Sequence, residues 1–133
     1  MEKPRRPISP HLQIYNIFSA QLTSGPSFLN RATGIVLAVG LIYMCIWLFT
    51  AALGEVYYDY FLRFITSWFG YLSLLGISLC FFYHLINGIR FLIFDLGYMI
   101  TKKAVFVSGM YMIVLTVVCF VLMWSYILYR HIL

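Results

Sequence analysis

Three long apolar runs without a formal charge constrain this fold more than any other feature. The runs are residues 35–54, 64–89 and 104–129. Each has at least 20 residues, and about 20 apolar residues in a helix cross the hydrocarbon core of a bilayer. The chain is 63% hydrophobic and only 10% charged, whereas a soluble domain needs more charge to cover its surface. We therefore predict an all-α membrane protein with three transmembrane helices, in preference to a soluble helical protein.

The flanking residues set the expected limits of these helices. The spans should cover about residues 27–53, 64–92 and 104–129 of one domain, residues 1–133. Residues 1–23 contain three prolines and should form an irregular segment at the membrane surface. Ser24 is a candidate cap for the first helix, Pro26 suits its first turn, and Gly97 should end the second helix. Residues 55–63 are expected to be a short outer loop.

The placement of Lys and Arg predicts an orientation. Seven of them flank the first span on its N-terminal side or lie between the second and third spans: Lys3, Arg5, Arg6, Arg31, Arg90, Lys102 and Lys103. Two lie on the other side: Arg63 and Arg130. Because basic residues concentrate on the inner side of a membrane, the N-terminus should face the cytoplasm or the mitochondrial matrix, and the C-terminus the opposite side. Basic residues that flank apolar spans do not predict a nucleic-acid partner.

His84 is the histidine that falls inside a predicted span. A titratable ring in the membrane is costly without a partner, so the imidazole is either a metal or haem ligand or is hydrogen-bonded to a neighbouring helix. Gly76, Cys80 and Gly88 share its helix face at four-residue steps. These small residues suit either a flat macrocycle or a close helix contact. A second axial ligand would have to come from another chain or from a methionine such as Met44, Met110 or Met123.

A polar cluster opens the first span. Ser27, Asn30, Arg31 and Gly34 have the spacing of one helix face. Arg31 could pair with an anion such as a haem propionate or the oxygen of a quinone, and Ser27 could donate to a quinone carbonyl. The alternative is ordinary helix capping and anchoring at the membrane boundary.

Arg90 and Asp95 form a third cluster, at the end of the second span. An acid at a helix C-terminus opposes the macrodipole. Asp95 should therefore need a cation nearby, and the candidates are Arg31, Arg90, Lys102 and Lys103. A salt bridge is the preferred interpretation over a catalytic role.

These residues stand in three blocks that together resemble one family. Residues 6–15, RPISPHLQIY, resemble a segment written RPxSPHLxIY, and residues 27–34, SFLNRATG, resemble SxxHRxTG. His84, Gly88, Arg90 and Asp95 match HxxxGxRxxxxD. The order and spacing of the blocks resemble the larger cytochrome b membrane-anchor subunit of succinate dehydrogenase, or respiratory complex II.

The resemblance implies a function and a set of roles. His84 would be an axial ligand of a haem b shared with a second anchor subunit. Ser27 and Arg31 would lie at a ubiquinone site near the iron-sulfur subunit, with Arg31 facing either the quinone or a haem propionate. Arg90 and Asp95 would form the polar inner end of the haem-bearing helix. Asn30 departs from the family, whose usual residue there is His, and an amide cannot carry charge or relay a proton as His can.

The implied complex also contains a flavoprotein subunit, which would oxidise succinate, and sits in a bacterial or mitochondrial inner membrane. The anchor alone should not oxidise succinate. Two other classes remain as alternatives. One is a haem-free structural anchor or assembly protein. The other is a small transporter, which predicts acidic residues in mid-span, and these three runs contain none.

Overall fold

All regular elements in the described part of the chain are helices, as the sequence predicts. The computed structural model describes residues 24–132, so the predicted surface segment at residues 1–23 lies outside the described residues. The helices are α2 (Ser24–Leu53), α3 (Glu55–Ile65), α4 (Trp68–Asp95) and α5 (Lys102–Ile132). Three of them, α2, α4 and α5, are long and apolar enough to cross a membrane. The three predicted spans are therefore confirmed.

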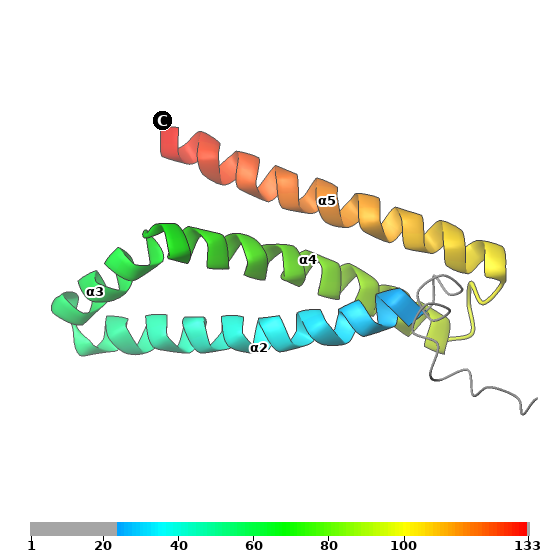
Figure 1. Cartoon of the computed structure of the whole chain (residues 1–133), viewed down its shortest axis with the longest axis horizontal. Helices are drawn as coiled ribbons and strands as arrows, with labels where there is room; N and C mark the ends of the chain where they lie inside the picture. Colours follow the sequence, from blue (N-terminus) through cyan, green and yellow to red (C-terminus); the bar gives the residue numbers. More distant parts are fainter. Residues whose placement is uncertain (1–23, 133) are drawn as a thin grey trace, which may run out of the picture.

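Helix α4 is the centre of the arrangement. It packs against α2 on one side and against α5 on the other, while α3 joins α2 to α4 at one end (Figure 1). The opposite end holds the start of α2, the end of α4 and the start of α5. Residues near the end of α4 can therefore reach both other spans.

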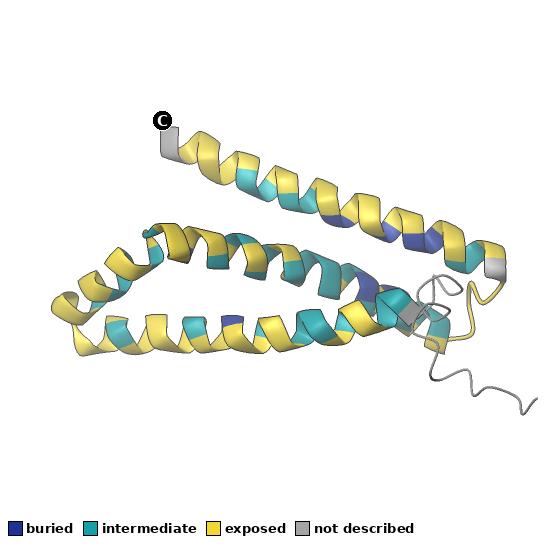
Figure 2. Ribbon diagram, viewed as in Figure 1, coloured by how far each residue is buried: buried dark blue, intermediate teal, exposed yellow. Residues whose placement is uncertain are grey.

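Burial is inverted relative to a soluble protein. Among the described side chains, four polar or charged ones are buried, and the one buried large hydrophobic is Met112. Most of the outer helix surface is exposed and apolar (Figure 2). This distribution fits a chain whose solvent is lipid, because polar groups in a bilayer must be satisfied inside the protein.

The predicted outer loop at residues 55–63 is wrong, because these residues form most of α3. Glu55 lies in its first turn and Arg63 in its last, which complements the helix dipole. Glu55, Asp59 and Arg63 recur at four-residue steps and place the charges on one face, with aromatic residues elsewhere. Short length and several tyrosines suggested a loop, whereas this amphipathic period indicates a helix.

Both ends of α4 have recognisable caps. Ser67 precedes the helix and its Oγ accepts a 3.3 Å hydrogen bond from the Gly70 N–H. The second span thus starts at Trp68, four residues later than predicted. At the other end Gly97 has φ +82°, and the Gly97 and Tyr98 amides bond back to the carbonyls of Phe94 and Ile93. This Schellman motif confirms Gly97 as the terminator of α4.

The other two spans are slightly longer than predicted. Helix α2 starts at Ser24, with Pro26 in its first turn as expected, and ends at Leu53. The predicted cap by the Ser24 side chain lies outside what the structure describes. Helix α5 covers Lys102–Ile132 rather than residues 104–129.

Candidate functional site

His84 lies on α4 with its ring held against α2. Its Nδ1 is 3.0 Å from the backbone oxygen of Asn30 and 3.3 Å from Oγ1 of Thr33. A carbonyl oxygen can only accept, so the bond to Asn30 assigns the proton to Nδ1. The Thr33 hydroxyl donates in turn to the Leu29 carbonyl at 2.8 Å. In this neutral tautomer Nε2 carries the lone pair.

The His84 side chain is half-buried. Nε2 makes no hydrogen bond to a described residue. In that part of the chain, outside the exposed residues, every fully buried side-chain nitrogen or oxygen has a hydrogen-bond partner, so Nε2 is not fully buried. Nε2 therefore reaches the surface of this chain. A Cβ built on Gly34 would lie 3.2 Å from His84 Cε1, so the absence of a side chain at Gly34 lets the imidazole pack closely on α2.

Asn87 joins this histidine site to the end of the bundle, one turn further along α4. Its side chain is fully buried, at 0% exposure. Its Nδ2 donates to the Pro26 carbonyl at 3.1 Å and to Oδ1 of Asn30 at 3.2 Å. Tyr83 donates to the same Pro26 carbonyl at 3.4 Å. The start of α2 is thus bonded to two successive turns of α4.

Arg90 connects α4 to α5. Its Nε donates to Ser108 Oγ at 3.0 Å, its Nη2 to the Val105 carbonyl at 3.0 Å, and its Nη1 to Oδ1 of Asn87 at 3.3 Å. The guanidinium also lies 4.6 Å from the centre of the Phe94 ring, which is a cation–π contact. All of these partners are neutral groups.

Asp95 forms no salt bridge with Arg90, the first of its four predicted partners, and the Lys102 side chain lies outside what the structure describes. Asp95 is exposed at the end of α4, while the hydrogen bonds of Arg90 point to Asn87 and α5. The physical reason is helical geometry, because residues five apart lie on different faces of a helix. Arg31 and Lys103 likewise form no ion pair with Asp95 in the described part of the chain.

The first predicted cluster is divided by the structure. Asn30 and Gly34 face α4 and contact its side chains. Arg31 is exposed and Ser27 is half-buried, and neither side chain bonds to another described residue. The structure therefore brings Asn30, His84 and Arg90 into one network through Asn87, and leaves Ser27 and Arg31 beside it at the start of α2.

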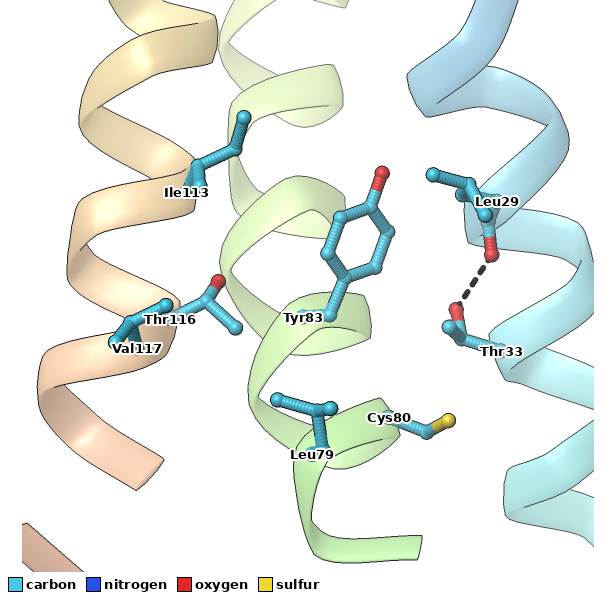
Figure 3. Close-up of a pocket in the computed structure, with 8 residues that line it drawn as sticks. All are labelled: Leu29, Thr33, Leu79, Cys80, Tyr83, Ile113, Thr116 and Val117. Atoms are coloured by element: carbon cyan, nitrogen blue, oxygen red, sulfur yellow. Dashed lines mark hydrogen bonds between the residues drawn. The ribbon is translucent and has the colours of Figure 1, made fainter. Parts of the chain in front are cut away.

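A pocket of about 290 Å³ borders this network. Figure 3 shows its walls, with Leu29 and Thr33 from α2, Cys80 and Tyr83 from α4, and residues of α5 opposite. The pocket is almost wholly apolar. It therefore provides a hydrophobic surface beside α4, the helix that carries the imidazole.

The residues present fit a haem iron better than a metal ion held by protein side chains alone. Among the described residues no three His, Cys, Asp or Glu side chains lie together. A haem needs one axial ligand from a chain, and an imidazole whose other nitrogen donates to a carbonyl is the usual form of such a ligand. A Cβ on Gly76 or Gly88 would meet nothing within 4 Å, so this chain leaves the space beside them unfilled.

The predicted methionine ligands are less well placed. Met44 is eleven residues beyond Thr33 on α2, which is about 16 Å along the helix. Two hydrogen bonds fix the register of α5 on α4: Ser108 lies beside Arg90 and Trp124 beside Ser78. The level of His84 on α5 is between them. Met110 and Met123 lie on either side of that level.

Comparison with known proteins identifies the family. The family model described as "Succinate dehydrogenase/Fumarate reductase transmembrane subunit" matches residues 2–123. The chain belongs to this family. A succinate dehydrogenase cytochrome b556 subunit of Rickettsia felis is 35% identical over 120 residues, or 90% of this chain and 91% of the relative. The b556 subunit of Paracoccus denitrificans is 31% identical over 130 residues, covering 90% and 95%. The b560 subunit of Marchantia polymorpha is 35% identical over 119 residues, covering 84% and 82%.

The family assignment agrees with the resemblance drawn from the motifs, and the chain is a transmembrane subunit of the cytochrome b type. The first of the three motif blocks, residues 6–15, lies outside the described residues. Sequence reasoning gave no role to Asn87 or Ser108. Asn87 had a usable signal, because it stands three residues from both His84 and Arg90 and so shares their side of α4.

Proposed function

We propose that this chain is the haem b- and quinone-binding anchor of a succinate:quinone oxidoreductase. It attaches the iron-sulfur and flavoprotein subunits to the membrane and pairs with a second anchor subunit. The observation that carries the proposal is His84, whose Nδ1–H donates to the Asn30 carbonyl and whose Nε2 reaches the surface. That is the arrangement of a metal-binding histidine, in a chain of the cytochrome b type.

His84 would hold the haem iron from this side, and the partner anchor would hold the haem from the other. Bound haem b would supply one-electron transfer through its iron. The protein contributes the orientation of the imidazole, through Asn30 and Thr33, and a surrounding from which water is excluded. A shared haem explains why this chain leaves the face beside Gly76 and Gly88 uncovered.

The quinone site lies at the start of α2. The Ser27 hydroxyl donates a hydrogen bond to a quinone carbonyl, and the Arg31 guanidinium stabilises negative charge on a quinone oxygen or on a haem propionate. Both residues are within the first turns of α2, where the helix dipole adds positive potential. Asn30 is less suited to the quinone, because its Oδ1 is engaged by Asn87. Asp95, exposed at the end of α4, is a candidate contact for a soluble subunit.

The basic residues orient the chain with its N-terminus in the cytoplasm or matrix, in a bacterial or mitochondrial inner membrane. The starts of α2 and α5 and the end of α4 then face the soluble subunits. This places Ser27 and Arg31 on the side where electrons from succinate arrive.

A reduced-minus-oxidised absorption spectrum of the purified complex tests the haem assignment. Wild type should show a b-type haem signal that His84→Ala abolishes or shifts, while His131→Ala, near the C-terminal end of α5, should leave it intact. An unchanged signal in the His84→Ala complex would remove His84 from the haem site. A wild-type complex without haem would instead favour a structural anchor.

The quinone assignment needs a separate assay. Arg31→Leu and Ser27→Ala should lower succinate-dependent quinone reduction while leaving succinate oxidation with a soluble electron acceptor intact. Arg63→Leu, an exposed cation on α3, is the matched control. Full quinone reduction in both α2 variants would refute the proposed site.

A further inference from the structure

The buried amide of Asn87 and the ring of His84 both donate hydrogen bonds to Asn30 on α2. Asn30 accepts from Asn87 Nδ2 through its side-chain Oδ1, at 3.2 Å, and from His84 Nδ1 through its backbone carbonyl, at 3.0 Å. Asn87 also holds the Pro26 carbonyl, one turn earlier, at 3.1 Å. The backbone carbonyl that accepts the hydrogen bond from His84 thus belongs to a segment of α2 that one amide group holds at two points.

Arg90 determines which way round that amide sits. A guanidinium has donors and no acceptor, so the group of Asn87 that faces Arg90 must be the oxygen. The 3.3 Å contact from Nη1 to Oδ1 satisfies this requirement. The NH2 group is then directed toward Asn30 and Pro26, where both partners are oxygens. Turning the amide over would leave donor facing donor at Arg90 and oxygen facing oxygen at α2.

The burial of both residues makes this arrangement selective. Asn87 is 0% and Arg90 6% exposed, so water or lipid headgroups do not compete for their bonds. In a bilayer, an unsatisfied polar group has no alternative partner nearby. The two side chains therefore have one low-energy orientation, and that orientation presents the Asn30 carbonyl to the imidazole.

We propose that Asn87, oriented by Arg90, is a positioning residue that holds the Asn30 carbonyl against His84 and so keeps the histidine protonated at Nδ1 with Nε2 available to iron. This inference rests on the proposed function, in which His84 ligates haem. A hydrogen bond from Nδ1–H to a carbonyl makes the imidazole a more basic ligand, which favours the ferric state. Losing the positioning should therefore raise the haem potential.

The test is the haem midpoint potential in the purified complex carrying Asn87→Leu, whose side chain has the same branched shape and number of heavy atoms but makes no hydrogen bonds. We expect ferrous haem to be favoured about threefold relative to wild type, which is roughly +30 mV at 59 mV per tenfold. Ser78→Ala is the matched control, since Ser78 is also on α4 but bonds to Trp124 on α5. Its potential should equal that of wild type.

Asn87→Ala provides a second variant if the leucine complex does not assemble. Its small, uncharged side chain makes none of the bonds to Arg90, Asn30 or Pro26, so its potential should also rise. Wild-type potential in either assembled Asn87 variant would overturn the positioning role. That outcome is distinct from failure of the proposed function, which would appear as a wild-type complex without haem or as a haem signal indifferent to His84→Ala.

Discussion

The two ends of the helix bundle are held together by different forces. At the Asn87 end, two buried polar residues of α4 bond to α2 and to α5 at distances of 3.0–3.2 Å. At the α3 end, contacts are aromatic, such as Tyr43 with Phe64 and Phe64 with Phe69, both at 6.1 Å between ring centres. Two apolar pockets of about 400 and 370 Å³ remain there between α3 and the spans.

The difference teaches where a membrane protein can build a rigid site. Lipid tails are as apolar as aromatic or aliphatic side chains, so apolar contacts between helices compete with lipid on nearly equal terms. Directional hydrogen bonds have no such competitor. His84 lies one turn from Asn87, within reach of the polar end, and its tautomer is set there.

The largest effect should follow loss of Arg90, which would break the polar end. Arg90→Leu removes the bonds to Ser108 and Val105 and leaves Asn87 Oδ1 buried without its donor. We expect a loss of roughly 2–4 kcal/mol in the free energy of unfolding, measured by denaturant titration of the purified protein in mild detergent. Arg63→Leu on α3 should change it by less than about 0.5 kcal/mol. Equal effects of the two variants would contradict the comparison.

Gly70→Ala should produce the second largest effect, and it acts at the α3 end. A Cβ on Gly70 would collide with the backbone carbonyls of Phe64 and Ile65 at the corner between α3 and α4. Backbone atoms cannot rotate away, so we expect a loss of about 1–3 kcal/mol in the same titration. Wild-type stability would mean that this corner is looser than its geometry indicates.

Gly34→Ala sharpens the comparison at the histidine. The added Cβ would lie 3.2 Å from His84 Cε1, and the ring must shift by a few tenths of an ångström. We expect a displaced haem absorption maximum and a loss of about 1 kcal/mol. Gly40→Ala is the control, because its Cβ meets the rotatable Ile77 side chain at 2.9 Å. A haem shift in the control but not in Gly34→Ala would contradict the assignment.

Ser78→Ala should have the smallest effect. It removes the 3.0 Å bond from Trp124 Nε1, and single interhelical hydrogen bonds in membranes average about 0.6 kcal/mol. Stability should fall by about that amount while the haem potential stays constant. A loss of unfolding free energy as large as that of Arg90→Leu would show that the polar end does not contribute most to holding the helices together.

Particular residues show how far sequence reasoning reached. The three spans followed from charge-free apolar length alone, and Gly97 was identified as a terminator because α4 needs a left-handed residue there. Helix α3 was missed although its charges recur every four residues. Arg90 was considered only as one of four candidate cations for Asp95, and its bonds to neutral groups of another helix were not predicted.

The sequence by itself therefore determined that this is a membrane-spanning chain, where its three spans lie to within a few residues, and to which family it belongs, because hydropathy and motifs are local properties. Only the tertiary structure decided the partners of its buried polar residues. Asn87, Asn30, Arg90 and Ser108 come from three helices, and their choice of partner depends on how those helices pack. The protonation of His84 at Nδ1 follows from that packing, since it requires the Asn30 carbonyl to lie within hydrogen-bonding distance.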